Sequence, residues 1–303
     1  MKRRVGLSIF NLQRKYGDKK ALEIAAKIGV DSVDFEFNNV DCNYRDPYSL
    51  YSKSDEEIIS YYTELGNYAK ELGIEIYQTH GTGGGFVNNK ERDDALIANN
   101  RIDCMATKAL GSEICVVHNP TTMAFSPDVD PELMRKLSYD MLSAMVKNAK
   151  QYGVKIASET FGDAVLFDCV DFFGDIDEFE MSCKRIMDDP ELKDNFTVCI
   201  DTGHSNKAMR YGNPTPADVI RRMGSDVTVL HLHDNDTVTD QHKIPMTGCI
   251  DWEDVLSALD EIGFSGVYNL EIGLTHFGDN FMIEEAEFGV KVMRNMLRDR
   301  YGE

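Results

Sequence analysis

Short apolar runs rich in β-branched residues recur along the chain, and each is followed by a longer stretch with helical periodicity. The pattern predicts eight strands, at residues 4–10, 31–37, 74–81, 113–120, 154–160, 196–204, 227–234 and 266–272. Strict alternation of strand and helix predicts parallel strands joined by right-handed crossovers. Several predicted helices end at a glycine just before the next strand, as helix C-caps often do.

Eight strand–helix units in 303 residues are what a (β/α)8 barrel requires. An open doubly wound sheet is the alternative, but such sheets usually carry a glycine-rich phosphate-binding turn after the first strand, where this chain has IFNLQRKYG. No linker-like stretch of Pro, Ser and Gly interrupts the alternation. We therefore expect an α/β fold in which residues 1–303 form a single (β/α)8 TIM-barrel domain.

Two predicted loops, residues 38–54 and 161–174, are longer than the usual strand-to-helix connection. Both follow strands, so in a barrel they would lie on the C-terminal face, where substrate pockets form. Their aromatic residues are Tyr44, Tyr48, Tyr51, Phe161, Phe167, Phe172 and Phe173. These side chains would either wall a pocket or pack the loops onto the barrel, and the sequence favours neither.

Composition excludes several classes of function. The chain has 32 basic and 52 acidic residues, and the net charge of −20 opposes binding to nucleic acid or to anionic membranes. No window approaches the ~18 apolar residues of a membrane span, and the N-terminus turns polar too early for a secretory signal. The seven cysteines have no CxxC spacing, which predicts neither a disulfide framework nor a thiolate zinc site. We expect a cytoplasmic protein.

Histidines and carboxylates stand at or just after the carboxyl ends of six predicted strands: His80, His118, Glu159, Asp201, His231 and Glu271. Successive members are about one strand–helix unit apart, so their side chains should converge on one rim of the barrel. Two Glu, one Asp and several His are the ligands expected around a divalent ion such as Mn²⁺, Zn²⁺, Co²⁺ or Mg²⁺. We therefore predict a metal site on the C-terminal face.

Two further patterns add candidate residues. With a period of two, His231 and His233 face the same side of their strand, so one is expected to be a ligand and the other to lie behind it or on the rim. Asp201 and His204 form an Asp-x-x-His pattern, in which Asp201 would bind the metal. His204, three residues into the predicted loop, would then reach a substrate hydroxyl or a second ion. The loop after the seventh strand brings Asp240, His242 and Lys243 close behind His231.

Most of the chain resembles the xylose-isomerase-like barrel superfamily, which includes sugar phosphate isomerases and epimerases, ketose 3-epimerases and endonuclease IV. The matching pieces are TH at 79–80, VVHNP around His118, SET at 158–160, DTGH at 201–204, HLHDND at 231–236, DQH at 240–242, GCIDW at 248–252 and LEI around Glu271. This combination is specific for the superfamily and not for a substrate.

The resemblance implies that the metal ligands are Glu159, Asp201, His231 and Glu271. The superfamily pattern His-x-x-acid favours His231, which Asp234 follows, over His233. In the epimerases the two metal-bound glutamates also exchange the proton next to a carbonyl, and the ion stabilises the cis-enediolate. The resemblance thus implies Glu159 and Glu271 as base and acid, with His204 as a further catalytic residue.

The expected protein is a sugar isomerase or epimerase that depends on one divalent ion, with Mn²⁺ favoured over Co²⁺, Mg²⁺ and Zn²⁺. Its partner would be a small-molecule sugar or glycoside, and the superfamily suggests a homo-oligomer. The expected substrate-binding residues are His80, His118, His204, His233, Asp240, His242 and Lys243. Val165 and Thr237 stand where ketose 3-epimerases carry Glu and Arg, which argues against free-ketose epimerisation in that form. A phosphorylated substrate would require a pocket such as Lys243 with the glycine run at 81–85.

Three alternatives stay open. A large subunit of a C-glycoside deglycosidase would use the same proton abstraction on 3-keto-glycosides, together with a small partner subunit. An endonuclease IV-like enzyme with three zinc ions is the second alternative. All nine of its ligand positions have suitable counterparts here: His80, His118, Glu159, Asp201, His204, His231, Asp240, His242 and Glu271. The net charge opposes this alternative. A non-catalytic binding barrel, with purely structural carboxylates, is the third.

Overall fold

The eight predicted strands form one parallel sheet in the computed structural model, which describes residues 3–37 and 45–302. They are β1 (Arg4–Ser8), β2 (Ser32–Glu36), β3 (Glu75–His80), β4 (Ile114–Val117), β5 (Lys155–Glu159), β8 (Phe196–Asp201), β9 (Val227–His231) and β10 (Val267–Leu270). Their order in the sheet is β10-β1-β2-β3-β4-β5-β8-β9.

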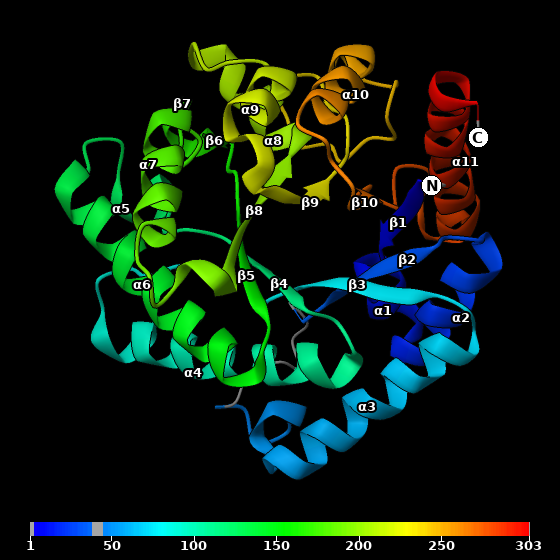
Figure 1. Cartoon of the computed structure of the whole chain (residues 1–303), viewed down its shortest axis with the longest axis horizontal. Helices are drawn as coiled ribbons and strands as arrows, with labels where there is room; N and C mark the ends of the chain where they lie inside the picture. The colour runs from blue at the N-terminus through cyan, green and yellow to red at the C-terminus, as the bar shows by residue number, and fades with distance from the viewer. Residues whose placement is uncertain (1–2, 38–44, 303) are drawn as a thin grey trace.

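The first and last strands of this order meet just beyond the end of β9. Leu232 and Leu270 form a parallel bridge. The backbone N–H of Leu232 donates to the Asn269 carbonyl at 2.8 Å, and that of Glu271 donates to the Leu232 carbonyl at 3.1 Å. The sheet therefore closes into the (β/α)8 barrel that the alternation of elements predicts, and helices surround it (Figure 1).

Eleven α-helices are found in the described residues, and most connect one barrel strand to the next. They are α1 (Phe10–Tyr16), α2 (Asp18–Ile28), α3 (Asp55–Glu71), α4 (Lys90–Leu110), α5 (Thr122–Phe125), α6 (Pro131–Tyr152), α7 (Ile176–Met187), α8 (Thr202–Ala208), α9 (Pro216–Met223), α10 (Trp252–Glu261) and α11 (Met282–Tyr301). Gly29, Gly111 and Gly153 end α2, α4 and α6 in the left-handed conformation, which confirms the predicted glycine C-caps.

Several elements differ from the prediction. The first strand ends at Ser8 rather than at residue 10, and α1 follows it. The sixth barrel strand ends at Asp201, three residues early, because the Asp201 carboxylate accepts a hydrogen bond from the His204 backbone N–H at 2.6 Å and starts α8. The loop at 161–174 contains a small antiparallel hairpin of β6 (Asp163–Ala164) and β7 (Cys169–Val170).

The interior of the barrel changes from apolar to polar along the strands. Ala157, Cys199 and Val229 belong to an apolar cluster inside the barrel, separate from the larger core that packs the helices onto the sheet. Because side chains alternate along a strand, the residues two positions further on point to the same interior. These residues are Glu159, Asp201 and His231. The strand pattern thus gathers ionisable groups at the carboxyl ends.

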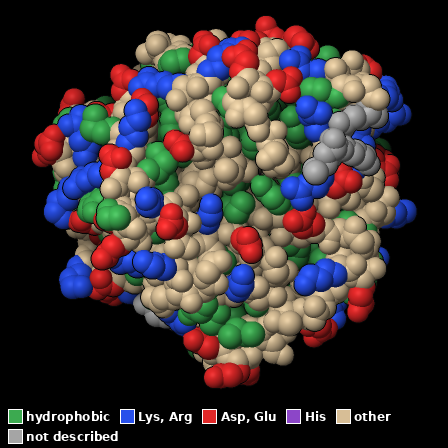
Figure 2. Space-filling view, viewed as in Figure 1, with side chains coloured by type: hydrophobic (Ala, Val, Ile, Leu, Met, Phe, Trp, Pro, Cys, Tyr) green, Lys and Arg blue, Asp and Glu red, His purple; other side chains and the backbone are tan. Residues whose placement is uncertain are grey.

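The surface mixes acidic and basic side chains on the face drawn in Figure 2. None of the described helices combines the length and the apolar character that a membrane crossing needs. Because both kinds of charge are mixed on the face that Figure 2 shows, the acidic excess of the sequence is not gathered into one patch there.

Candidate active site

A cavity of about 560 Å³ opens at the carboxyl ends of the strands. Its lining comes from several strand ends and from the loops that follow them. The lining residues are Ser8, Phe10, Asn11, Glu36, His80, His118, Phe161, His204, Asp240, Gln241, His242, Glu271, Ile272, Gly273, Thr275 and His276. Five of the seven histidines of the chain therefore reach one cavity, and two of them, His80 and His118, were predicted there from their strand-end positions.

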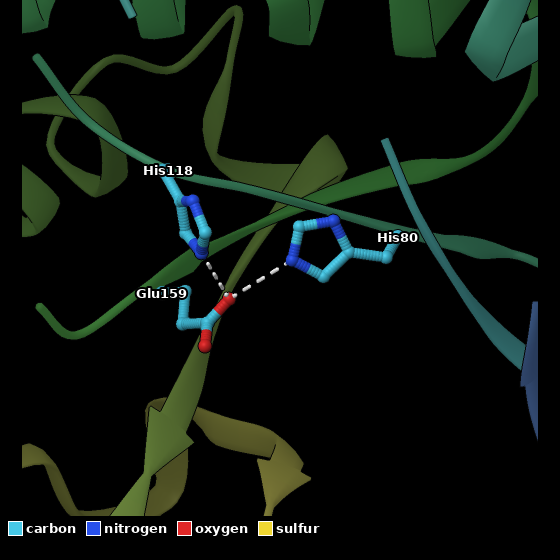
Figure 3. Close-up of side chains that lie close together, drawn as sticks. All are labelled: His80, His118 and Glu159. Atoms are coloured by element: carbon cyan, nitrogen blue, oxygen red, sulfur yellow. Dashed lines mark hydrogen bonds and ion pairs between the residues drawn. The ribbon is translucent and has the colours of Figure 1, made fainter. Parts of the chain in front are cut away.

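Glu159 at the end of β5 is the centre of a first cluster (Figure 3). Its Oε2 lies 2.9 Å from Nε2 of His118 and 3.4 Å from Nε2 of His80, so the two rings flank one carboxylate oxygen. Its Oε1 lies 2.8 Å from Nδ1 of His231. The same Nδ1 atom is 3.3 Å from Oε2 of Glu271. Glu159 and Glu271, from β5 and the end of β10, thus meet at one imidazole nitrogen.

Asp201 is part of a second cluster. Its two carboxylate oxygens lie 3.0 and 3.1 Å from Nε2 of His233. The His233 ring stacks on the ring of His242, with centroids 3.9 Å apart. Asp240 approaches Nε2 of both His242, at 3.3 Å, and His204, at 3.5 Å. The loop after β9 therefore packs its ionisable groups directly onto Asp201 and α8.

His204 joins the two clusters. Its Nδ1 is 3.6 Å from Oε1 of Glu159 and 3.7 Å from Oδ1 of Asp201. The same nitrogen lies 3.0 Å from the Thr160 carbonyl, and a hydrogen bond to this acceptor requires a proton on Nδ1. His204 stands in the first turn of α8 rather than in a loop, since Asp201 caps that helix. The helix therefore fixes the position of its ring over Glu159.

The donor atoms fit one or more divalent ions. In each of three sets, the candidate ligand atoms lie within 4.8 Å of one another. These sets are His80–His118–Glu159, His80–His231–Glu271 and His204–Asp240–His242. In addition, Oε2 of Glu271 is buried and has no hydrogen-bond partner. A buried carboxylate oxygen in that state is expected where a cation completes its surroundings.

Burial and the neighbouring histidines separate the pKa values of the two glutamates. Burial by itself raises the pKa of Glu159, but His231 and His118 outweigh it and hold that pKa well below the usual range. For Glu271, burial dominates over the opposing effect of His231 and raises the pKa to about 8. The site therefore gives its two carboxyl groups different proton affinities.

The predicted site residues lie at different depths relative to the cavity. His80, His118, His204, Asp240, His242 and Glu271 line the cavity. Glu159, Asp201 and His231 lie beneath them, each at most 1% exposed. His233 is fully buried behind Asp201. The Lys243 backbone pairs with that of Asp234, and Lys243 is not among the described residues that line the cavity.

The aromatic residues of the two long loops have different environments. Phe161 lines the cavity. Tyr51 and Phe173 are buried against the barrel, which matches the packing alternative. Tyr48 is 90% exposed, and Tyr44 lies outside the described residues. The structure thus supports a pocket-wall role for Phe161 only, among the described members of this set.

Strand β2 carries two residues that the sequence analysis overlooked. Glu36 lines the cavity, and its carboxylate is 3.9 Å from Nδ1 of His80. Burial raises the pKa of Glu36 to about 7, against the opposing effect of His80. Asp34, two residues earlier, lies 2.9 Å from Nε2 of His231. The signal was present in DSVDFEF, because acidic residues two positions apart share one face of a strand.

His276, in the loop after β10, was also overlooked. It lines the cavity, and its two ring nitrogens lie 2.6 Å from Oε1 of Glu285 on α11 and 2.6 Å from the Gln241 carbonyl. The residue therefore connects the loop that carries Asp240 and His242 to the outer helix. It does not stand at a strand end, so the spacing argument did not reach it.

Parts of this chain are similar in sequence to curated proteins. An uncharacterised protein, MJ1311, of Methanocaldococcus jannaschii is 31% identical over 54% of this chain and 51% of its own length. Inosose isomerase of Bacillus subtilis is 29% identical over 46% of this chain and 48% of its own length. The alignments thus span about half the length of these curated relatives.

Solved structures match nearly the whole chain. A D-tagatose 3-epimerase-like protein superposes with a TM-score of 0.73 at 22% identity, covering 98% of this chain and 99% of the other. The IOLI protein with a bound zinc atom gives 0.70 at 19% identity, covering 98% and 97%. A 3-keto-D-glucoside 4-epimerase from E. coli gives 0.67 at 14% identity, covering 98% and 100%. At these identities the matches show a shared fold.

A family model described as xylose isomerase-like TIM barrel matches residues 22–296. This range contains seven of the eight barrel strands and every ionisable residue of the two clusters. The chain therefore belongs to the xylose isomerase-like TIM barrel family.

Proposed function

We propose that this protein is a divalent-metal-dependent sugar isomerase or epimerase that moves a proton at a carbon next to the carbonyl of a keto sugar or sugar derivative. The observation that carries the proposal is the meeting of Glu159 and Glu271 at Nδ1 of His231, below an open cavity. Two carboxylates from different strands, directed at one point, can remove a proton from one face of a substrate and return it on the other through a cis-enediolate.

The names of several matched proteins support this proposal. The relative from B. subtilis is an inosose isomerase, and two of the matched structures are a D-tagatose 3-epimerase-like protein and a 3-keto-D-glucoside 4-epimerase. Zinc is bound in the structure of the IOLI protein. For this chain we infer one divalent ion, with Mn²⁺ favoured and Co²⁺, Mg²⁺ and Zn²⁺ as alternatives. Its ligands would be Glu159, Asp201, His231 and Glu271.

A bound divalent ion would neutralise negative charge that develops on the substrate oxygens during proton transfer. The side chains of the chain itself would do the rest. Glu159 would act as base and Glu271 as acid, in either order for the two directions of reaction. His204, held over Glu159 by α8, would contact a substrate hydroxyl. His80, His118, Asp240 and His242, which line the cavity, would bind further hydroxyl groups.

The charge of the cavity favours an unphosphorylated substrate. No Lys or Arg occurs among the described residues that line it. Residues 38–44, which lie outside the described part, contain none either. A phosphate group is usually bound by Arg, Lys or a glycine-rich nest of backbone N–H groups. We therefore expect a neutral sugar or glycoside.

Incorporation of deuterium from solvent tests the proposed reaction. The metal-loaded protein is incubated in D₂O with ketoses, inososes and 3-keto-glycosides, and products are followed by NMR. The expected result is one deuterium at the carbon next to the carbonyl of a single substrate class. Release of an aglycone from a 3-keto-glycoside would instead identify the C-glycoside deglycosidase alternative, which begins with the same proton abstraction. Absence of exchange with every substrate, in protein with bound metal, would contradict the proposal.

One observation favours a second candidate, a phosphodiesterase with three zinc ions. The His204–Asp240–His242 set is separate from the ligands proposed above, and His80 and His118 provide further donors. The net charge of −20 counts against a nucleic-acid substrate. Metal content by inductively coupled plasma mass spectrometry separates the candidates. About one ion per chain supports the isomerase, whereas three zinc ions with cleavage of bis-p-nitrophenyl phosphate would support the phosphodiesterase.

A further inference from the structure

Asp34 on β2 is a fully buried carboxylate inside the barrel. Its Oδ2 accepts from Nε2 of His231 at 2.9 Å, from the Gln78 amide at 3.0 Å and from the Asn269 amide at 3.4 Å. Its Oδ1 is buried without a hydrogen-bond partner. Three donors from β3, β9 and β10 thus converge on one oxygen of this side chain.

The His231 ring is held between Asp34 and the proposed metal ligands. Nε2 faces Asp34, while Nδ1 faces Oε1 of Glu159 at 2.8 Å and Oε2 of Glu271 at 3.3 Å. An ionised carboxylate can only accept hydrogen bonds, so Nε2 must carry the proton of this contact. Nδ1 faces the Glu159 carboxylate in the same way, so in this contact it carries a proton as well. A histidine ligates a metal only as the neutral ring, and a proton kept on Nε2 by Asp34 leaves the lone pair on Nδ1, on the side where the two glutamates lie.

We propose that Asp34 is a positioning residue that holds His231 in its Nε2-protonated tautomer and so makes Nδ1 the metal-ligating atom. The inference rests on the proposed function, because it concerns a ligand of the metal proposed there. A carboxylate behind a ligating histidine fixes the orientation of the ring and raises its basicity, and losing such a partner typically weakens metal binding.

The surroundings of Asp34 favour this role over a purely structural one. A buried carboxylate has a large desolvation cost unless a charged or strongly polar partner compensates it. Among the described contacts of Asp34, none comes from Lys or Arg, and the shortest hydrogen bond is to His231. A neutral amide would satisfy the two other donors, Gln78 and Asn269, at a lower desolvation cost. The carboxylate is therefore best explained by the imidazole that it orients.

Zinc affinity of the full chain tests the proposal without any substrate. The protein is stripped with chelator, and the zinc dissociation constant is measured by competition with a chromophoric chelator. We expect Asp34→Asn to weaken zinc binding by about 10-fold and Asp34→Leu by up to about 100-fold. Gln78→Leu is the matched control, because it removes a donor to the same oxygen and leaves the His231 contact. The zinc affinity of Gln78→Leu should stay within about 3-fold of wild type, a smaller loss than we expect for either Asp34 variant.

A spectroscopic measurement separates positioning from general loosening of the barrel. In zinc-loaded protein with ¹⁵N-labelled histidine, the His231 signals are assigned by their absence in His231→Gln. Wild type should show a protonated Nε2 whose proton exchanges slowly, and a metal-bound Nδ1. In Asp34→Leu this proton should exchange rapidly. If Asp34→Leu does not fold, the near-isosteric Asp34→Asn provides both measurements.

The possible results have distinct meanings. Equal zinc affinity of wild type and of folded Asp34→Leu would overturn the inference and leave the proposed function intact. So would a loss in Gln78→Leu as large as that in Asp34→Leu, because the effect would then come from packing. Failure of the wild-type chain to bind any divalent ion would overturn the proposed function, and this inference with it.

Discussion

Gly203 lies so close to the ring of His233 that a methyl group on its Cα would come within 1.9 Å of Cε1. Gly203 stands between Asp201, which caps α8, and His204. The missing side chain allows His233 to reach the Asp201 carboxylate at 3.0 Å. A close approach between the start of a helix and the end of a neighbouring strand thus determines where a proposed metal ligand lies.

We predict that Gly203→Ala lowers the free energy of unfolding by about 1–3 kcal/mol, because the added methyl group must displace a buried ring. It should also weaken zinc binding, since Asp201 loses its contact with His233. Urea unfolding and zinc competition measure the two effects. Gly162→Ala is the control, because its methyl group would meet the His204 carbonyl at 3.3 Å, an adjustment of only a few tenths of an ångström. Equal stability of the two variants would contradict the prediction.

The proposed acid and base can be neutralised with little change of shape. Glu159→Gln and Glu271→Gln should each reduce deuterium incorporation by about 10²–10⁴-fold, because each removes a proton-transferring group. Both should also bind less metal, as measured by mass spectrometry. Glu178→Gln, on α7, changes a carboxylate that pairs with Arg135 away from the cavity and should exchange at the wild-type rate. Wild-type exchange in both active-site variants would exclude this mechanism.

Asp240 distinguishes one ion from several. Its carboxylate contacts Nε2 of His204 and of His242 but none of the four proposed ligands. If the site holds one ion, Asp240→Asn should leave about one metal per chain and affect mainly substrate binding, as a rise in KM. If the chain binds three zinc ions, the same variant should lose at least one of them. Metal analysis of wild type and variant under identical loading conditions decides between the two results.

We predict that the free energy of unfolding depends on pH through Asp171, which is not one of the proposed metal ligands. It is fully buried and accepts hydrogen bonds from the backbone N–H groups of Thr122 and Phe173. Burial, partly offset by these bonds, raises the pKa of Asp171 from 3.8 to about 6. The pKa of Asp171 is thus higher in the folded chain than in the unfolded chain. Its protonated carboxyl group therefore stabilises the fold fully below pH 4, and this contribution is lost as the pH rises through 6.

The matched variant is Asp171→Asn, which stays uncharged throughout. Relative to this variant, the wild-type chain should lose up to about 3 kcal/mol of unfolding free energy between pH 4 and pH 7. Urea unfolding at four pH values, in the presence of chelator, gives the comparison. Parallel pH profiles of the two proteins would mean that Asp171 does not titrate in this window.

The barrel and most of its cavity could be predicted from the sequence. Short apolar runs rich in β-branched residues identified each strand, and the carboxyl ends of parallel strands must lie on one rim, so His80, His118, Glu159 and Glu271 could be placed together. The end of β8 was wrong by three residues. The strand ends at Asp201 because the Asp201 side chain accepts a hydrogen bond from the His204 backbone and starts α8, a contact that is visible only in three dimensions.

Local pattern therefore determined which residues share the carboxyl-end face, because strand periodicity and strand ends are properties of neighbouring residues. Only the tertiary structure decided which of them touch. His231 and His233 share one face in the strand pattern, yet one faces Glu159 and the other Asp201. Asp34 reaches His231 across 197 positions of chain. Such pairings depend on closure of the barrel and on close packing, which bring together residues that no local sequence signal connects.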